Sequence, residues 1–310
     1  MPATPPPREI EADSGGVRLA GSVWMPADGA DAGVLMHPGS GPSDRDNDVF
    51  FPPIREHLLA AGIAVCSFDK RGVGGSSGRW QDAGIAEQAD DLGAALAAFR
   101  AASPSGLPLG LFGHSQGGWV VVEAAGRGIP VAFVVTSSGG AVTPARQERY
   151  SLARRLARDG VAEADAAEAL AAFDAVMTVA RGRTSLDRGL ERLDATGLEY
   201  RVLGELNVMF EDETVWRLVS DINDYDPAQA LARIAVPLLA LFGSSDEITP
   251  PEESVAALRE TVRPDLLQIE VFPTGDHRLK HGEPPRFVDG YLDRLAAFIR
   301  SAAAASTERL

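Results

Sequence analysis

Short apolar runs alternate with segments of helical spacing along most of the chain. The runs are continuously apolar, which is typical of strands buried on both faces of a parallel sheet. They cover residues 32–37, 63–69, 108–113, 131–137, 237–243 and 266–273. Helical spacing appears at residues 50–61, 84–100, 251–262 and 286–302, and from residue 117 onward. This alternation predicts an α/β fold with a mostly parallel central sheet flanked by helices.

Two parts of the chain depart from the alternation. Residues 9–13 and 17–25 resemble two short strands joined at Gly15 and Gly16, which predicts a hairpin. Within 142–233 the pattern is helical throughout, with helices expected at 150–160, 162–180, 197–210 and 213–222. We therefore expect a core of residues 9–141 and 234–302, a helical insertion at 142–233, and flexible termini at 1–8 and 303–310.

Composition adds charge and compartment to this picture. The 310 residues are 45% hydrophobic, and 29 basic against 44 acidic residues give a net charge of −15. Such a field repels nucleic acid and anionic membranes, so neither is expected as a partner. The single cysteine, Cys66, lies in an apolar run and is expected to be a buried, inert thiol. No signal segment and no run of about 20 apolar residues is present, so we expect a cytoplasmic protein.

A nucleophile motif follows the third of the apolar runs. The pattern G-x-S-x-G marks a sharp turn from strand to helix that exposes a serine hydroxyl, and residues 113–117 (GHSQG) match it. The apolar run 108–112 precedes the motif and helical spacing follows it, so Ser115 is the expected nucleophile. A nucleotide-binding turn at this point would need a phosphate-binding fingerprint, which the sequence lacks.

A second match to the same pattern lies at residues 74–78 (GGSSG). Its serine, Ser76, has neither a strand directly before it nor an apolar helix behind it. We therefore interpret Ser76 as part of a glycine-rich loop.

A serine nucleophile needs a base, and histidine has the pKa for that role. Of the five histidines, His277 alone lies in a short loop directly after a predicted strand, with His281 as the alternative. The base in turn needs a carboxylate to orient it. Asp246 follows the strand at 237–243 and is the expected acid, with Glu247 and Asp276 as competitors. The order Ser115, Asp246, His277 is the order typical of α/β-hydrolases.

With these motifs the chain resembles the alpha/beta-hydrolase superfamily, and most of all its bacterial esterases and dienelactone-hydrolase-like members. The resemblance rests on HPGSGPSDRD (37–46), FDKRGVGGSSG (68–78), GHSQGG (113–118), residues 225–250 and GDH (275–277). It implies that residues 142–233 form a helical cap, or lid, over the active site. Large apolar residues of that segment are core or pocket candidates, namely Tyr150, Phe173, Met177, Phe210 and Trp216.

The resemblance also implies an oxyanion hole of two backbone N–H groups. One is expected from Gln116, the residue after the nucleophile. The other is expected from the loop after residues 32–37, where Pro38 has no N–H, so Ser40 is favoured over Gly39 and Gly41. His37, His114 and Arg71 are expected to brace these loops or line the pocket. Asp44, Arg45 and Asp46, together with Asp69 and Arg71, are expected to pair and so to brace the two loops.

The expected activity is hydrolysis of a carboxylic ester or related acyl compound through an acyl-Ser115 intermediate, as in a carboxylesterase. Thioesterases, aminopeptidases and C–C bond hydrolases use the same triad and remain alternatives, as does a non-catalytic binding protein. The sequence contains no metal-binding motif and implies no cofactor. The expected partner is a small acyl substrate, and a homodimer is compatible with the sequence.

Overall fold

An eight-stranded sheet forms the centre of the molecule. The structure is a computed structural model that describes residues 6–199 and 209–307. The strands are β1 (Arg8–Ser14), β2 (Val17–Trp24), β3 (Ala32–His37), β4 (Ile63–Phe68), β5 (Leu109–His114), β6 (Val134–Ser137), β7 (Leu238–Gly243) and β8 (Leu267–Phe272). Their order is β1-β2-β4-β3-β5-β6-β7-β8, and all pairs from β4 to β8 are parallel. The expected α/β class and mostly parallel sheet are confirmed.

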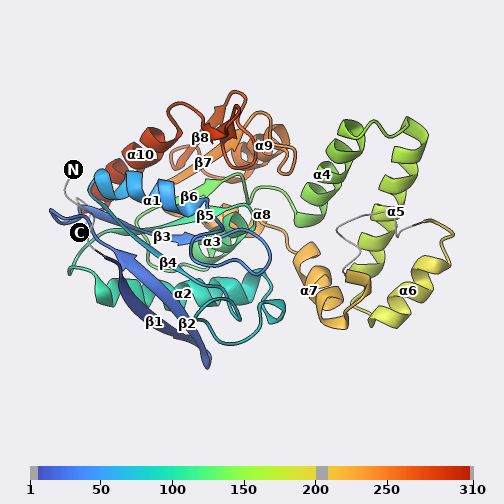
Figure 1. The fold of residues 1–310 in the computed structure, drawn as a ribbon, viewed down its shortest axis with the longest axis horizontal. Helices are drawn as coiled ribbons and strands as arrows, with labels where there is room; N and C mark the ends of the chain where they lie inside the picture. The colour runs from blue at the N-terminus through green and yellow to red at the C-terminus, as the bar shows by residue number, and fades with distance from the viewer. Residues whose placement is uncertain (1–5, 200–208, 308–310) are drawn as a thin grey trace.

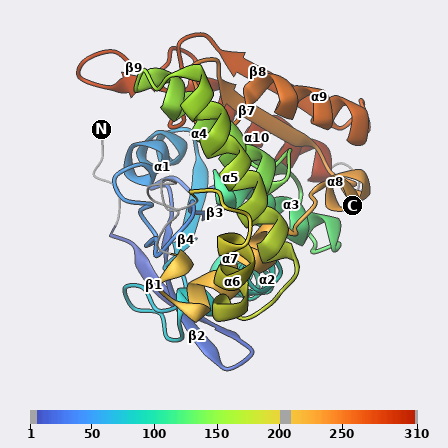
Figure 2. The same ribbon diagram turned by 90° about the vertical axis from the view of Figure 1, so that its right-hand side faces the viewer.

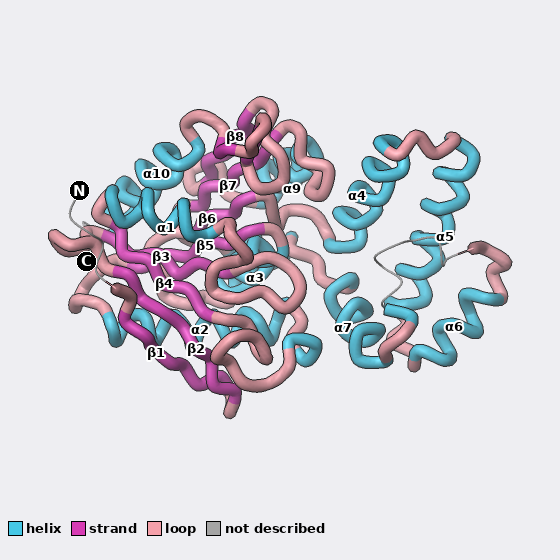
Figure 3. The backbone as a smooth tube through the Cα atoms, viewed as in Figure 1, coloured by secondary structure: helices cyan, strands magenta, loops and turns pink. Residues whose placement is uncertain are grey.

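Helices cover both faces of this sheet (Figures 1 and 3). One face packs against α1 (Phe51–Ala60) and α10 (Tyr291–Thr307). The other packs against α2 (Ile85–Ala102), α3 (Gln116–Gly126), α8 (Ala228–Arg233) and α9 (Pro251–Thr261). Strands β3, β4, β5 and β7 are buried along their whole length, because each is covered on both sides. The carboxyl ends of the parallel strands therefore point to one edge, where their loops gather.

The remaining helices form a group with an apolar core of its own (Figures 1 and 2). They are α4 (Pro144–Arg158), α5 (Glu163–Arg181), α6 (Leu186–Asp194) and α7 (Glu213–Asn223). Phe173 and Trp216 are 1% and 0% exposed and lie in this core together with Met177 and Phe210. The helix expected at 197–210 lies largely outside the described residues. Helix α8 falls inside the expected insertion but packs on α3 and α9 of the core.

The last helix differs from expectation at both ends. It begins at Tyr291 and not near residue 286, because Gly290 has φ 83°, which no α-helix accommodates. The residues before it form a short antiparallel pair of β9 (Lys280–His281) with β10 (Arg286–Phe287). The helix continues to Thr307, since Ala302 and Ala303 are buried against the sheet, so the expectation of a flexible tail from residue 303 was wrong for 303–307. Arg8, expected in a flexible leader, is the first residue of β1.

Candidate active site

Ser115 lies on a tight turn between β5 and α3. Its backbone has φ 54° and ψ −122°, a conformation that non-glycine residues rarely adopt and that is maintained only where the surroundings enforce it. The flanking glycines are required by close packing: a Cβ at Gly113 would lie 2.1 Å from the Gly117 carbonyl oxygen, and one at Gly117 would lie 2.5 Å from that of His37. The turn therefore presses against the loop that follows β3.

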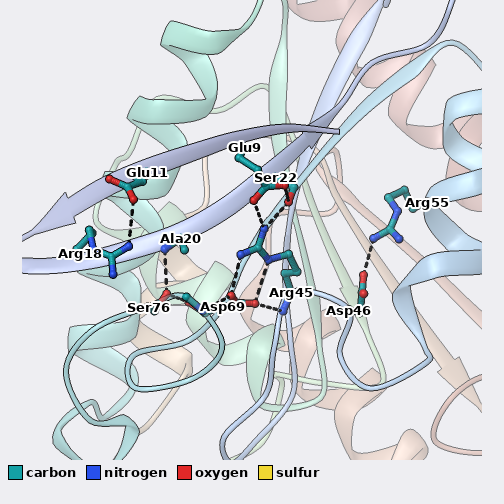
Figure 4. A network of polar contacts seen from close by, with 11 residues as sticks. Glu9, Glu11, Arg18, Ala20, Ser22, Arg45, Asp46, Arg55, Asp69 and Ser76 are labelled. Carbon is teal, nitrogen blue, oxygen red and sulfur yellow. Dashed lines mark hydrogen bonds and ion pairs between the residues drawn. The ribbon is translucent and has the colours of Figure 1, made fainter. Parts of the chain in front are cut away.

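Ser76 has a structural role instead. Its hydroxyl donates to the Asp69 carbonyl oxygen at 2.8 Å and accepts from the N–H of Ala20 at 2.9 Å (Figure 4). These bonds connect the glycine-rich loop to β2. The interpretation of Ser76 as a loop residue agrees with these contacts.

His277 and Asp246 come together from the loops after β8 and β7. Nδ1 of His277 lies 2.9 Å from Oδ2 and 3.1 Å from Oδ1 of Asp246. The carboxylate is 1% exposed, and its Oδ1 also accepts the backbone N–H groups of Ile248 and Thr249, each at 2.8 Å. Three donors therefore hold the carboxylate, and the carboxylate in turn holds the imidazole with Nε2 directed away from it.

Ser115 and His277 line the same open pocket of about 500 Å³. Among the described residues, the Ser115 hydroxyl makes no hydrogen bond, not even to His277, so it is free to rotate. A hydroxyl and an imidazole in one pocket, the latter backed by a buried carboxylate, can carry out nucleophilic attack with general base assistance.

The alternatives for base and acid are engaged elsewhere. His281 lies 3.5 Å from the Thr274 hydroxyl. Glu247 forms ion pairs with arginines of α4 at 3.0 and 3.6 Å. Asp276 accepts the backbone N–H groups of its own turn.

His114, directly before the nucleophile, supports the position of His277. Its Nε2 donates to the carbonyl oxygen of His277 at 3.2 Å, and its Nδ1 accepts from the Asn47 amide at 3.0 Å. Burial lowers the pKa of His114 well below its ordinary value, and the nearby His277 lowers it further. His114 is therefore neutral, with the proton on Nε2. Asn47 was not identified from the sequence, because this asparagine belongs to no catalytic motif. Its backbone has φ 48°, a conformation that asparagine tolerates.

Lys70 lies between the loop after β3 and the start of α3. It is 8% exposed, and its ammonium donates to the Gly39 carbonyl oxygen and, at 3.0 Å, to Oε1 of Gln116. Burial lowers the pKa of Lys70 to about 7, and no carboxylate among the described residues forms an ion pair with it. The sequence analysis missed this residue, although a lysine placed two positions after a buried strand, at the edge where the loops gather, is a signal of its own.

The contacts continue from Gln116 into the core. Nε2 of Gln88 donates to Oε1 of Gln116 at 3.4 Å and to the Ala83 carbonyl oxygen at 3.1 Å. Oε1 of Gln88 accepts from Nε2 of His37 at 3.3 Å. Burial, and secondarily Lys70, lowers the pKa of His37 to about 3, so this imidazole is neutral. The N–H of Gly39 donates to the Asn47 side chain, which leaves Ser40 as the next N–H along the loop.

Arg45 braces the two loops, whereas Arg71 pairs outside them. Arg45 forms a bidentate contact with Asp69 and also reaches Glu9 and Ser22 on the hairpin (Figure 4). Arg71 pairs with Asp91 of α2, at 2.6 and 2.7 Å, rather than with an acid of the loop after β3.

Asp44 and Asp46 of the loop after β3 make their contacts locally or with α1. Asp46 pairs with Arg55 of α1 at 2.7 Å (Figure 4). Asp44 accepts the backbone N–H of Asp46 at 3.1 Å. Within the set expected to brace the two loops, the pair across them is therefore Arg45 with Asp69, whereas Arg71 contacts the helix behind it.

A second pocket of about 450 Å³ lies between the core and α4 and α7. Its walls are largely apolar, with Phe68 and Leu92 from the core and Leu152, Leu218 and Val219 from the helical group. His37, Ser40, Lys70, Arg71 and Gln116 also line it. Ser40 belongs to both pockets, so the loop after β3 is their common wall.

Within residues 6–199 and 209–307, no group of three or more His, Cys, Asp or Glu side chains is arranged to hold a metal ion. None of the helices in this part of the chain is long and apolar enough to cross a membrane.

The family model described as alpha/beta hydrolase fold matches residues 34–281. The chain belongs to the alpha/beta hydrolase family. Among solved structures it is similar to the Pyrococcus furiosus esterase Pf2001 (18% identity, TM-score 0.64, covering 96% of this chain and 91% of that one). It is also similar to the proline iminopeptidase of Mycobacterium smegmatis (19% identity, TM-score 0.62, 96% and 100% covered). At these identities the structural likeness shows the fold alone, and no curated protein matches in sequence.

Proposed function

We propose that this alpha/beta hydrolase is a serine hydrolase that cleaves carboxylic esters through an acyl-Ser115 intermediate. The observation that carries the proposal is the strained turn at Ser115, in one pocket with a histidine whose Nδ1 is bonded to the buried Asp246. The esterase activity named for the Pyrococcus furiosus structure is consistent with it.

The geometry supports the following reaction. Nε2 of His277 takes the proton of Ser115 as Oγ attacks the ester carbonyl carbon, and Asp246 stabilises the imidazolium that forms. The carbonyl oxygen becomes an oxyanion, for which we propose the backbone N–H groups of Gln116 and Ser40 as donors. The imidazolium then gives its proton to the departing alcohol. Water next attacks the acyl carbon as the same histidine takes its proton, and the histidine returns that proton to Oγ of Ser115 as the Oγ–acyl bond breaks and the acid departs.

The pocket beneath α4 and α7 is proposed to hold the acyl group. It shares Ser40 with the Ser115 pocket, and its apolar walls favour a hydrocarbon chain. In this proposal, residues 142–233 act as the cap, with α4 and α7 supplying its contribution to the pocket.

Ser115→Ala tests the proposal. We expect p-nitrophenyl acetate hydrolysis to fall by about 10⁴-fold or more, because the covalent route is lost. A fluorophosphonate probe should label the wild type at Ser115 and leave the variant unlabelled. Ser76→Ala is the matched control and should keep labelling at the wild-type level. Undiminished hydrolysis by Ser115→Ala would disprove the assignment.

A further inference from the structure

Lys70 bonds to both segments that carry the proposed oxyanion donors. On one side it holds the carbonyl oxygen of Gly39, and on the other it holds the Gln116 side chain. These segments are far apart in sequence, the first after β3 and the second at the start of α3. No other described side chain bonds to both.

The contact with Gly39 controls the direction of the Ser40 N–H. The carbonyl of Gly39 and the N–H of Ser40 belong to one planar peptide unit, and the only cis peptide among the described residues lies elsewhere. In a trans peptide the two groups point in opposite directions, so the N–H of Ser40 points away from Lys70. A hydrogen bond to the carbonyl oxygen also polarises the peptide and strengthens its N–H as a donor.

The contact with Gln116 acts on the second of these segments, the start of α3. Gln116 is the first residue of α3 and follows the strained Ser115, so its orientation decides where its N–H points. A Cβ added at Gly39 would lie 3.5 Å from the Ser115 Cβ, which shows how closely the loop approaches the nucleophile. Small movements of either segment would therefore change the distance between the two N–H donors.

A buried lysine without a carboxylate partner is costly, since burial disfavours its charged form. Nothing in the triad chemistry uses this side chain. Its contacts are instead directed to a main-chain carbonyl and an amide of the two loops.

We propose that Lys70 is a positioning residue that holds the Gly39–Ser40 peptide and Gln116 together and so sets the geometry of the oxyanion hole. The inference rests on the proposed serine hydrolase function and adds a residue that this function did not require.

Lys70→Met is the direct test, because methionine has similar length and no donor. We expect kcat for p-nitrophenyl acetate to fall about 10- to 100-fold, less than the about 10²- to 10³-fold typical of a deleted donor, because the N–H groups remain but are misplaced. KM should stay within about twofold, since the donors act on the transition state. Lys280→Met, at a half-buried lysine outside both pockets, is the control and should match the wild type.

An oxyanion-forming inhibitor separates positioning from mere structural support. A trifluoromethyl ketone adds to Ser115 and places an anionic oxygen in the hole. In Lys70→Met its Ki should rise by about the factor by which kcat falls, with both values expressed per site labelled by fluorophosphonate. A purely structural lysine would reduce the number of labelled sites while leaving Ki and kcat per site unchanged, and that result would overturn the proposal.

Gln116→Leu provides a second route that does not depend on Lys70→Met folding. It removes the Oε1 acceptor and keeps the backbone N–H, so kcat and inhibitor affinity should both fall. The double variant should lose no more than Lys70→Met alone, because both changes break the same link. Additive losses, or an unchanged Ki in Gln116→Leu, would contradict the proposal.

Failure of this inference is distinguishable from failure of the proposed function. Full activity in Ser115→Ala would remove the serine mechanism and with it the oxyanion hole. Loss of activity in Ser115→Ala together with wild-type kcat and Ki in Lys70→Met would retain the mechanism and reject the role of Lys70.

Discussion

The two sides of Ser115 are held by different kinds of interaction. On the proposed acid–base side, formed by the loops after β7 and β8, a buried carboxylate holds His277 and is itself held by two backbone N–H groups. On the proposed oxyanion side, formed by the loops after β3 and β4 and the start of α3, a buried lysine and neutral side chains contact main-chain and amide groups.

The surroundings of the two sides differ as well. Helix α4 contacts the acid–base side, where the Tyr150 hydroxyl donates to the Asp246 carbonyl oxygen at 2.9 Å and Arg158 pairs with Glu247. The oxyanion side adjoins the 450 Å³ pocket and has Lys70 and His37 in its wall. The comparison indicates that one carboxylate–imidazole pair holds the acid–base side, whereas several buried groups hold the oxyanion side, among them a histidine that burial keeps neutral and a lysine whose pKa burial lowers.

The strongest test of this contrast is Asp246→Asn. We expect kcat/KM to fall by about 10³- to 10⁴-fold, because an amide does not stabilise the imidazolium and favours the wrong tautomer of His277. Glu247→Gln changes the neighbouring carboxylate in the same way and should stay within about threefold of wild type, as expected for a partly exposed ion pair. Similar losses in the two variants would show that the acid–base side does not depend on Asp246 alone.

Acid should destabilise the protein through the oxyanion side. The pKa of His37 is about 3, while an unfolded histidine titrates near 6.5, so the unfolded chain binds a proton that the folded one rejects. Stability from neutral His37 is therefore present above pH 6.5 and lost as the pH falls toward 3. Each pH unit costs about 1.4 kcal/mol in the free energy of unfolding.

His37→Gln isolates this effect. Urea unfolding at pH 7.5 measures the effect of the packing change alone. Between pH 6.5 and 4.5, the free energy of unfolding of the variant should decrease by about 2 to 3 kcal/mol less than that of the wild type. Equal slopes in the two proteins would show that His37 takes up its proton in the folded state.

The smallest expected effect concerns the pocket next to the oxyanion side. Val219→Trp adds volume to its α7 wall, so hydrolysis of p-nitrophenyl octanoate should fall about 10-fold relative to the acetate. Val161→Trp, at an exposed position after α4, is the control and should keep the wild-type ratio. An unchanged octanoate-to-acetate ratio in Val219→Trp would mean that the acyl group lies elsewhere.

Local patterns were enough to predict the strands and the site's position at one sheet edge. Each strand from β3 to β8 lies within or next to an apolar run, and Ser115, Asp246 and His277 lie in the short turns after such runs. The start of α10 was predicted too early. The helical spacing continues through residues 286–290, whereas the backbone there is not helical. The partner of Arg71 was not predicted, because Asp91 lies on a helix whose facing side the spacing alone did not identify.

By itself, the sequence determined the α/β class, the strand-turn-helix at Ser115 and the chain order of the three proposed catalytic residues, because these depend on neighbours along the chain. Only the tertiary structure decided that Lys70 bridges Gly39 and Gln116, that Gln88 and His37 lie behind them, and that His114 holds the backbone of His277. Such contacts join loops from different strands, and their distances depend on how the whole sheet and its helices pack.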